Sequence, residues 1–355
     1  MRILTVIGNR PQFIKASAVS SRLRSRAEEV TVHTGQHYDR ELSQVFFDEL
    51  KLPPPEHLLG IGGGTNTAQT ARMLAALEPL LADLRPDAVL VYGDTNSTLA
   101  GALAAVQAGV PVAHVEAGMR SFDRSMPEEV NRVVTDHLAR LLLVPSQTAV
   151  ENLRRESVDG TVELVGDVMV DVAMLLQPGA RARTETLAPY GVEPGGYVLA
   201  TAHRAGNVDD PARLARLVEL LLSLDRPTIL PLHPRTRARL LDAGLLEALE
   251  QAGHMRLAKP LGYLDFTALL CNAHAVLTDS GGVQKEAYLA GVPCVTMRPN
   301  TEWVETVEAG WNVLVDLDAS AAATALGRTP PPERPQLYGD GAAGERVAAA
   351  IAALT

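Results

Sequence analysis

The chain of 355 residues has no apolar stretch that approaches the ~20 residues needed to span a bilayer. Its net charge of −10 argues against a general affinity for nucleic acid or anionic membranes, because such binding requires a basic surface. The N-terminus, MRILTVIGN, has the pattern of a short strand and not that of a signal peptide. We therefore expect a cytoplasmic protein with no nucleic-acid and no membrane partner.

Cysteine and the common nucleotide and metal motifs are also scarce. Cys271 and Cys294 lie far apart in apolar sequence, which favours two buried thiols in a reducing compartment over a disulfide. The segment 60–65 (GIGGGT) lacks the GxGxxG spacing of dinucleotide-binding proteins, and the chain has no Walker lysine motif. The two histidines of HTGQH (33–37) have no acidic third ligand in place, so we predict no metal site there.

Short apolar runs alternate with amphipathic stretches in the first half of the chain. A content of 46% hydrophobic and 21% charged residues is that of an ordinary globular protein, and the length suits two domains. Strands are predicted at 2–8, 29–33, 87–92, 111–116 and 141–144. Helices are predicted near 12–25, 40–50, 67–84, 95–108 and 127–139. Nearly continuous apolar strands that alternate with helices are typical of a parallel sheet covered on both faces.

The pattern restarts after residues 176–196, a segment rich in proline, glycine and charge that is interpreted as a connector. The strand-like segments that follow it are YVLATAH, PTILPLH, AVLTDS and PCVTM. The simplest account is an α/β protein with two doubly wound Rossmann-like domains, 1–170 and 171–355, facing across a cleft. Ligands of such domains bind at the carboxyl ends of the strands. The tail GERVAAAIAAL is predicted to be a helix that packs on either half.

Charged residues follow the strands of the first half. Arg10 and Lys15 lie at the start of the first helix, where unpaired N–H groups attract anions, so that both side chains are placed to face a phosphate. A surface pair explains them equally well. Asp94 follows the strand at 87–92, where an aspartate most often caps the next helix, a contribution of ~1 kcal/mol.

Two glutamates strengthen the case for a site at this edge of the sheet. Glu116 follows a strongly apolar strand, where an acid without a partner is costly. Glu128 begins the next helix, where acids suit the helix dipole, and a helical pair with Arg132, worth ~0.3–0.5 kcal/mol, explains it as well. Three acids that gather at one edge of a sheet are nevertheless typical of a proton-transfer site.

The second half carries a glycine-rich turn, Ser280-Gly281-Gly282, between a buried strand and a helix. Its glycines let the backbone approach a ligand, and the helix start offers N–H groups to a diphosphate; a turn that serves only geometry is the alternative. Glu286, about one turn into the helix, is placed to accept both ribose hydroxyls. His203 and His233 each follow a strand, and we expect His203 to act as a phosphate partner or proton donor.

Nine segments together resemble the non-hydrolysing UDP-N-acetylglucosamine 2-epimerases, cytoplasmic enzymes with the two-domain fold called GT-B. In family order they are GNRPQFIK, TGQHYD, YGDTNSTLA, HVEAGMRS, PEEVNR, TAHRAGN, LHPRT, LTDSGGVQKEA and TEWVETVEAGWNVLV. The resemblance covers nearly the whole chain and implies reversible conversion of UDP-GlcNAc to UDP-ManNAc by a homodimer, for polysaccharide or glycan synthesis. It implies elimination of UDP to a glycal and re-addition, without NAD, another redox cofactor or a metal.

The resemblance also implies roles for the residues noted above. Asp94, Glu116 and Glu128 would form the acid–base and sugar-positioning set, and His203 would assist the departing diphosphate. The residues implied in substrate binding are Arg10, Lys15, Arg132, Ser280, Gly281, Gly282 and Glu286. Which of the three carboxylates is the base stays open.

Bacterial members of the family bind a second UDP-GlcNAc as an activator. The positions that resemble this activator site are Gln36, His37, Arg72, Arg204 and His233. The chain departs from the common family pattern at Asn9, Gln12, Gly206 and Lys285, where the family has Thr, Glu, Glu and Glu respectively. These departures bear on the activator site and on the fine specificity, and they leave the core acids and the glycine-rich turn intact.

Four other functions fit parts of the pattern. A 2-epimerase for a 2,3-diacetamido uronic acid sugar nucleotide would need an added cation near the sugar carboxylate, and a hydrolysing epimerase would release free ManNAc and UDP. A GT-B glycosyltransferase would not need three clustered acids in its first half, and an inactive nucleotide-sugar sensor would have lost them. The presence of all three acids favours the epimerase.

Overall fold

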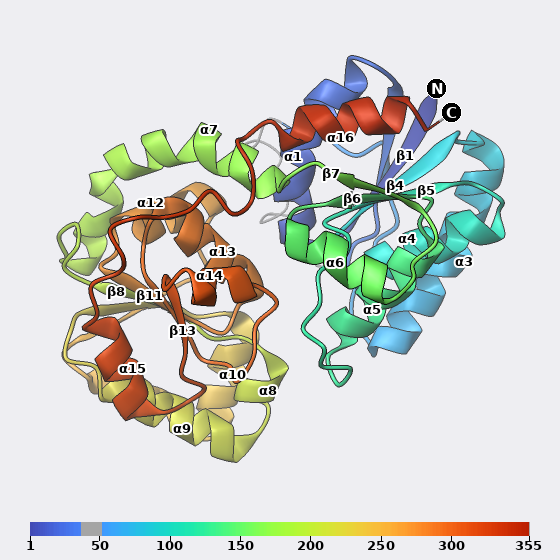
Figure 1. Ribbon diagram of the computed structural model, residues 1–355. Coiled ribbons are helices and arrows are strands. Elements are labelled where there is room, and N and C mark those ends of the chain that lie inside the picture. The colour runs from blue at the N-terminus through green and yellow to red at the C-terminus, as the bar shows by residue number, and fades with distance from the viewer. Residues whose placement is uncertain (37–51, 355) are drawn as a thin grey trace. The chain divides into compact units, whose positions relative to one another are not determined.

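The computed structural model describes residues 1–36 and 52–354, which form two compact units. The first unit contains Met1–Met174 and Gln336–Thr355, and the second contains Leu175–Pro335. Each unit is built on a parallel sheet with interleaved helices, which confirms the predicted α/β class with two doubly wound sheets (Figure 1). Over the described part of the chain, no helix combines the length and the apolar character that crossing a membrane requires.

The first unit has a seven-stranded parallel sheet in the order β3-β2-β1-β4-β5-β6-β7. Its strands are β1 (Arg2–Ile7), β2 (Glu28–His33), β3 (His57–Leu58), β4 (Ala88–Tyr92), β5 (Val112–Val115), β6 (Leu141–Val144) and β7 (Thr161–Leu164). The central strands are buried along nearly their whole length, as expected for a sheet covered on both faces. The edge strands β3 and β7 are not predicted from the sequence because one has two residues and the other is largely exposed.

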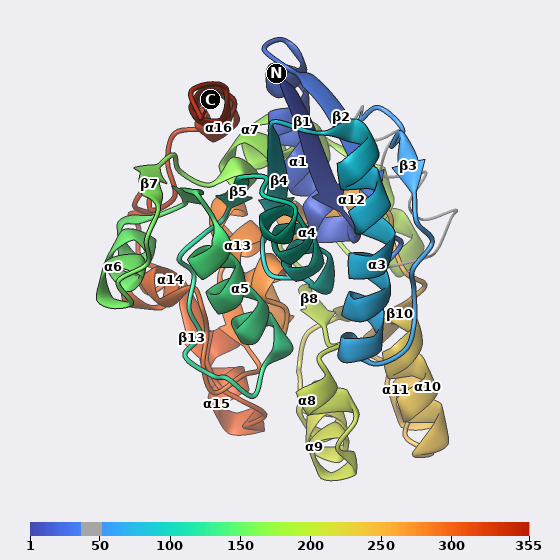
Figure 2. The same ribbon diagram turned by 90° about the vertical axis from the view of Figure 1, so that its right-hand side faces the viewer.

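The helices of the first unit follow the predicted alternation. They are α1 (Arg10–Arg24), α3 (Asn66–Leu84), α4 (Asn96–Gln107), α5 (Pro127–Leu138), α6 (Gln147–Arg155) and α16 (Ala343–Ala352), and α7 (Val168–Ala182) leads out of the unit. α3, α4 and α5 lie side by side (Figure 2). α4 approaches the sheet closely at Gly101, where an added Cβ would lie 3.0 Å from a methyl carbon of Val91. The helix predicted near 40–50 lies outside the described residues.

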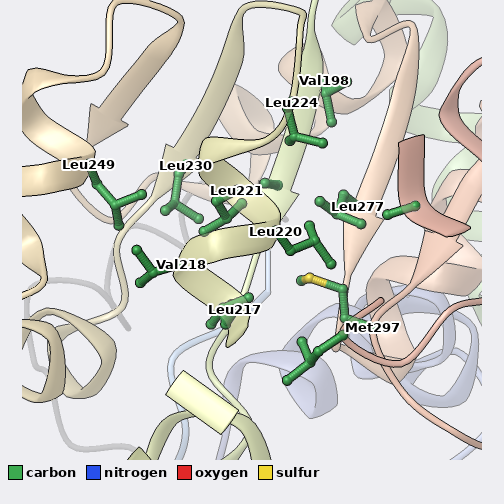
Figure 3. Packing of buried hydrophobic residues seen from close by; sticks show 14 of the residues in the cluster. Val198, Leu217, Val218, Leu220, Leu221, Leu224, Leu230, Leu249, Leu277 and Met297 are labelled. Carbon is green, nitrogen blue, oxygen red and sulfur yellow. The ribbon is translucent and has the colours of Figure 1, made fainter. Parts of the chain in front are cut away.

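The second unit has a six-stranded parallel sheet in the order β10-β9-β8-β11-β12-β13. Its strands are β8 (Val198–Thr201), β9 (Thr228–Pro231), β10 (Met255–Ala258), β11 (Ala275–Thr278), β12 (Cys294–Thr296) and β13 (Asn312–Leu314). Its helices are α8 (Ala205–Val208), α9 (Pro211–Leu222), α10 (Pro234–Asp242), α11 (Leu246–Gln251), α12 (Tyr263–Asn272), α13 (Gly281–Ala290), α14 (Val304–Glu308) and α15 (Ala319–Leu326). Buried leucines of α9 pack against β9 and β11 in one apolar cluster (Figure 3).

Two expectations about the second unit have clear outcomes. Cys271 and Cys294 are free and buried, as predicted, and burial raises the pKa of the first thiol to about 11 and of the second to about 12. The prediction of a connector over 176–196 is wrong for its first part, because α7 continues through Pro178 to Ala182. Side-chain donation by Arg181 to the carbonyl groups of Cys271 and Ala290 holds this end of α7 on the second unit, so the proline does not end the helix.

The C-terminal helix α16 packs on α1 of the first unit (Figure 1). Gly344 permits this approach, because a Cβ at that position would overlap the carbonyl oxygen of Ala18. The carboxylate of Asp171 accepts the N–H groups of Ala343 and Gly344 at 3.1 and 2.9 Å and so satisfies the start of the helix. The last residues of the chain are therefore part of the first unit.

Replacing Gly344 with alanine is expected to lower the free energy of unfolding by about 1–3 kcal/mol, because the new methyl group meets a backbone oxygen that cannot rotate away. Chemical denaturation measures the change. Gly179→Ala in α7 is the matched control: no atom lies within 4 Å of its added Cβ, so the variant should be neutral or slightly stabilised. Equal stability of the two variants would contradict the close packing of α16 on α1.

Candidate functional site

In each sheet the direction of strand order reverses at one point, and ligands of doubly wound sheets bind beyond the carboxyl ends of the strands there. The reversal lies between β1 and β4 in the first unit and between β8 and β11 in the second. Most of the predicted residues follow these strands or a direct neighbour. Arg10 and Lys15 follow β1, Asp94 follows β4, Glu116 follows β5, His203 and Arg204 follow β8, and Ser280, Gly281 and Gly282 follow β11.

Lys15 and Glu116 form an ion pair at the edge of the first sheet. Each side chain is only 11% exposed, so the buried glutamate has the partner that its position requires. Gly93 lies against the pair, since an added Cβ would be 3.1 Å from Nζ of Lys15 and 3.2 Å from Oε2 of Glu116. Glu116 has a φ of 71°, a left-handed conformation that is uncommon outside glycine and concentrates at functional sites.

Asp94 pairs with Arg132 and does not cap a helix. The N-cap of α4 is Thr95, which forms a reciprocal capping box with Thr98, so the capping interpretation of Asp94 is wrong. The guanidinium of Arg132 contacts Asp94 with one nitrogen and donates to Glu129 with the other at 2.8 Å. The acid of α5 that pairs with Arg132 is thus Glu129, three residues earlier, and the simple helical pair with Glu128 is not what the structure shows.

Glu128 and Glu129 have different environments although they are neighbours. The carboxylate of Glu129 is buried and accepts the N–H groups of Ser121 and Phe122, both at 2.9 Å, which fixes the loop after β5. Glu128 is half-buried and has no side-chain hydrogen bond or ion pair within the described residues. It lies on the same face of α5 as Arg132, the residue that pairs with Asp94.

Gln12 is a buried residue that sequence reasoning does not select as functional. Its Oε1 accepts the N–H of Gly8 at 2.7 Å, and its Nε2 donates to the Tyr92 carbonyl at 2.9 Å and to the Thr98 hydroxyl at 3.0 Å. It therefore ties the turn after β1 to the turn after β4. Arg10, half-buried, begins α1 beside it. The departure from the family glutamate at position 12 is the one signal of its importance in the sequence.

In the second unit, Asp279 shapes the turn that carries His203 and Arg204. Its fully buried carboxylate accepts the N–H of His203 at 3.1 Å and that of Arg204 at 3.0 Å. The amide of Asn207 donates to the same group at 3.2 Å. The His203 side chain is 42% exposed, and its Nδ1 lies 3.7 Å from Asp279. Asp279 is also missed by sequence reasoning, which treats LTDS only as a strand end.

Replacing Asp279 with asparagine is expected to lower the free energy of unfolding by about 1–3 kcal/mol, because an amide NH2 would then face donors. Affinity for UDP, the ligand that the family resemblance implies, should fall as well, since the His203–Arg204 turn loses its anchor. Denaturation and calorimetric titration with UDP measure the two effects. Asp242→Asn, at an exposed position on α10, should change neither by more than about 0.5 kcal/mol. Native behaviour of the Asp279 variant would refute this role.

The start of α13 has the features of an anion-binding helix end. Ser280 is the N-cap and makes no side-chain cap bond, so the first N–H groups are not satisfied by it. An added Cβ at Gly282 would have no atom within 4 Å, whereas one at Gly281 would overlap the carboxylate of Glu302. Glu286 is half-buried on the same helix.

Cations gather around this helix start. Arg298 lies 2.9 Å from one oxygen of Glu302, and Arg204 lies 3.8 Å from the other. Nζ of Lys285 lies 4.3 Å from the centre of the Trp303 ring. Burial lowers the pKa of Arg298, and the charge of Arg204 adds to this effect against the opposing effect of Glu302. Three cations, Arg204, Arg298 and Lys285, thus lie near the helix start together with the carboxylate of Glu302.

The residues expected in an activator site lie on both units. Gln36 accepts the N–H and the hydroxyl of Ser97 at 3.1 and 2.7 Å, and Arg72 donates to the carbonyl of Gly62 at 3.0 Å. Both therefore hold local structure in the first unit. His37 lies outside the described residues.

The other two residues expected in the activator site, Arg204 and His233, belong to the second unit. The ring of His233 lies 5.8 Å from that of His203, so the structure brings this residue to the predicted phosphate partner.

As for metals, residues 1–36 and 52–354 contain no group of three or more His, Cys, Asp or Glu side chains arranged to hold an ion. His33, one of the two histidines considered above, accepts the N–H of Gly35 at 2.8 Å.

Two doubly wound sheets, with paired acids at the reversal point of one and a glycine-rich helix start at that of the other, define an enzyme of the GT-B class. A sequence model of the family described as UDP-N-acetylglucosamine 2-epimerase matches residues 21–352. The chain belongs to this family.

Relatives of the chain include enzymes with two different names. A protein of Pseudomonas aeruginosa named UDP-2,3-diacetamido-2,3-dideoxy-D-glucuronate 2-epimerase is 47% identical over 367 residues, 100% of each chain. A UDP-N-acetylglucosamine 2-epimerase homolog of Methanococcus maripaludis is 48% identical over 316 residues, 89% of this chain and 88% of the other. The crystal structure of Methanocaldococcus jannaschii UDP-GlcNAc 2-epimerase in complex with UDP-GlcNAc and UDP matches with a TM-score of 0.93 and 40% identity over 99% of both chains.

Proposed function

We propose that the protein interconverts UDP-GlcNAc and UDP-ManNAc by epimerisation at carbon 2, without hydrolysis. The observation that carries this proposal is the placement of two paired carboxylates, Glu116 with Lys15 and Asp94 with Arg132, beyond neighbouring strands at the reversal point of the first sheet. Family membership supports an epimerase, and the solved relative with UDP-GlcNAc and UDP supports a UDP-sugar.

The chemistry explains why the site needs acids. Carbon 2 has no neighbouring carbonyl group, so its proton is not acidic by itself. A carboxylate removes that proton while the C1–O bond to UDP breaks, the electron pair of the C2–H bond forms the C1=C2 double bond of a glycal, and UDP leaves with the C1–O pair. In the reverse sense, UDP adds to carbon 1 while a proton is delivered to the other face of carbon 2. Nothing is oxidised or reduced overall, so the proposal needs no nicotinamide cofactor. That no metal is required is part of the proposal as well.

Residues of the first unit would handle the sugar. Lys15 and Arg132 hold the Glu116 and Asp94 side chains in fixed positions through their ion pairs. Proton transfer to and from opposite faces of carbon 2 requires at least two such groups. Glu128, which has no partner among the described residues, is the remaining carboxylate for contacts with the sugar.

Residues of the second unit would handle UDP. The start of α13, with Ser280, Gly281 and Gly282, would offer N–H groups to the diphosphate. Arg10, at the start of α1, stays a predicted partner of a phosphate. His203, exposed and fixed through its backbone by Asp279, would assist the departing diphosphate. Glu286 would hold the ribose. A diphosphate that is held after the C1–O bond breaks is available for re-addition.

A second substrate is favoured by two observations. The full-length relative from Pseudomonas aeruginosa is named for a 2,3-diacetamido glucuronate sugar nucleotide, whose sugar carries a carboxylate. Lys285 is a cation where the family pattern commonly has a glutamate, and its Nζ is held over Trp303. An epimerase for this uronic acid would use the same acids. Homodimerisation and activation by a second UDP-GlcNAc remain part of the proposal for either substrate.

Purified protein incubated separately with UDP-GlcNAc and with the diacetamido glucuronate analogue tests the proposal. Chromatography and NMR should show UDP-ManNAc with UDP still attached at equilibrium, and a higher kcat/KM for UDP-GlcNAc. A higher kcat/KM for the uronic acid would select the second substrate, and free ManNAc with UDP would indicate a hydrolysing epimerase. If neither sugar changes at carbon 2, the epimerase proposal is wrong.

A further inference from the structure

Four buried or half-buried ionic side chains next to the Glu116 turn have no part in the reaction described above. They are His114, Arg120, Asp136 and Glu156. His114 and Asp136 are fully buried, and the Arg120 side chain is buried between two acids. Arg120 donates to both oxygens of Glu156 at 2.8 and 2.7 Å and to Asp136 at 2.7 Å. An array of charges in the interior costs free energy unless it is fully paired. The presence of these four side chains beside the Glu116 turn therefore requires an explanation.

His114, on β5, lies between two oxygen atoms. Its Nδ1 is 2.7 Å from Oδ1 of Asp136, and its Nε2 is 2.7 Å from the carbonyl oxygen of Gly93. A carbonyl oxygen only accepts hydrogen bonds, and so does an ionised carboxylate. Both ring nitrogens must therefore donate as long as Asp136 is ionised, and an imidazole that donates from both nitrogens is the protonated cation.

The surroundings of Asp136 favour its ionised form. Its second oxygen accepts the N–H of Gly118 at 3.1 Å and a guanidinium N–H of Arg120 at 2.7 Å. Both of these donors favour the carboxylate over the carboxylic acid whatever the protonation state of His114, so Asp136 is taken as ionised. The charges that face His114 and Asp136 from neighbouring elements are thus one guanidinium and, beyond it, Glu156.

These contacts fix the two turns that carry the reacting acids. The His114 ring holds the carbonyl of Gly93, the residue directly before Asp94. Asp136 holds the backbone on both sides of Glu116, through the His114 ring on one side and the Gly118 N–H on the other. Glu116 has a left-handed φ, a conformation that persists only where its surroundings enforce it. A single buried histidine ring therefore links the backbone positions of both carboxylates.

We propose that His114, kept doubly protonated by Asp136, is a positioning residue that fixes the spacing between Asp94 and Glu116. It touches neither the sugar nor the diphosphate. The effect of His114 on catalysis rests on the proposed function, whereas the protonation state of His114 does not.

The protonation state is tested first, by NMR of the wild-type protein labelled with ¹⁵N in histidine. The His114 resonances are identified by their loss in His114→Gln. At neutral pH, both ring nitrogens should have the shifts of protonated nitrogens, and both ring protons should be protected from solvent. A His114 nitrogen with the shift of an unprotonated imidazole would overturn the proposal whether or not the protein epimerises any sugar.

The positioning role is tested by kinetics of three variants. His114→Gln and Asp136→Ala should each lower kcat about 10- to 100-fold, because misplacement of a reacting group by about 1 Å is costly, while KM and UDP affinity change less than about twofold. The kcat of the double variant should be no lower than that of either single variant, since both substitutions remove the same His114–Asp136 link. Glu156→Gln, which weakens the far end of the array, should lower stability and leave kcat unchanged.

The outcomes separate the inference from the proposed function. Absence of epimerisation by the wild-type protein would reject the proposed function, while the NMR result would still decide the state of His114. An active wild type with native kcat in His114→Gln, or a kcat loss in Glu156→Gln equal to that in His114→Gln, would reject the positioning role. If His114→Gln does not fold, Asp136→Ala and the wild-type NMR spectrum still decide the case.

Discussion

Glu116→Gln is expected to lose exchange of the carbon-2 proton by about 10²- to 10⁴-fold, the usual contribution of a positioned acid or base, and to bind UDP as the wild type does. The substitution keeps the shape of the side chain but removes its ability to accept a proton from carbon. UDP affinity should survive because the residues proposed to hold the diphosphate lie mainly on the second unit. Deuterium incorporation followed by NMR and calorimetric titration with UDP measure the two quantities.

Two sets of controls make the result specific to Glu116. Glu345→Gln removes an exposed glutamate that pairs with Arg26 on the surface, and it should leave both quantities unchanged. Asp94→Asn and Glu128→Gln, measured in parallel, show which carboxylate has the largest effect on exchange. Near-normal exchange in Glu116→Gln, with folding intact, would mean that the paired glutamate is structural.

Gly282→Ala is expected to weaken UDP binding by about 1–3 kcal/mol, roughly 5- to 150-fold, without destabilising the protein. In the described residues an added Cβ meets no atom within 4 Å, so the protein itself has room for it. The methyl group would instead occupy space that a diphosphate needs when it approaches the N–H groups of the helix start. Titration with UDP and thermal melting of the same sample separate affinity from stability.

Gly281 and Gly253 provide the comparisons for that variant. Gly281→Ala places its Cβ on the Glu302 carboxylate, so we expect a loss of stability together with affinity. Gly253→Ala lies away from α13 in open space and should change neither. Native UDP affinity in Gly282→Ala would show that the diphosphate binds elsewhere.

The sequence predicts the two sheets well because each central strand is marked by its own run of apolar residues, which is a local signal. Apolar runs of four to six residues form the central strands, and helical stretches separate them. The signal fails where burial is incomplete, as in the exposed edge strand β7, and where tertiary contacts outweigh a local preference, as at Pro178 in α7. The order of the strands then places the residues that follow β1, β4, β8 and β11 at the two reversal points.

The pairings within the site are not predictable from local pattern. Lys15 and Glu116 are 101 positions apart, so only the fold reveals that they form a pair. Asp94 precedes a helix, and propensity alone makes it a cap, whereas Thr95 takes that role. Glu128 and Glu129 differ by one position, which is about 100° around a helix, and this rotation decides which acid is buried against Arg132. Asp279 is missed because nothing local shows that its carboxylate faces the turn after β8.

Solvent deuterium at carbon 2 tests the central claim most directly. The wild-type protein is incubated with UDP-GlcNAc in deuterated water with no added nicotinamide cofactor, and carbon 2 of substrate and product is followed by NMR. Removal and return of a proton by side-chain carboxylates predicts UDP-ManNAc that carries deuterium at carbon 2. Formation of UDP-ManNAc that retains the original proton would contradict the account.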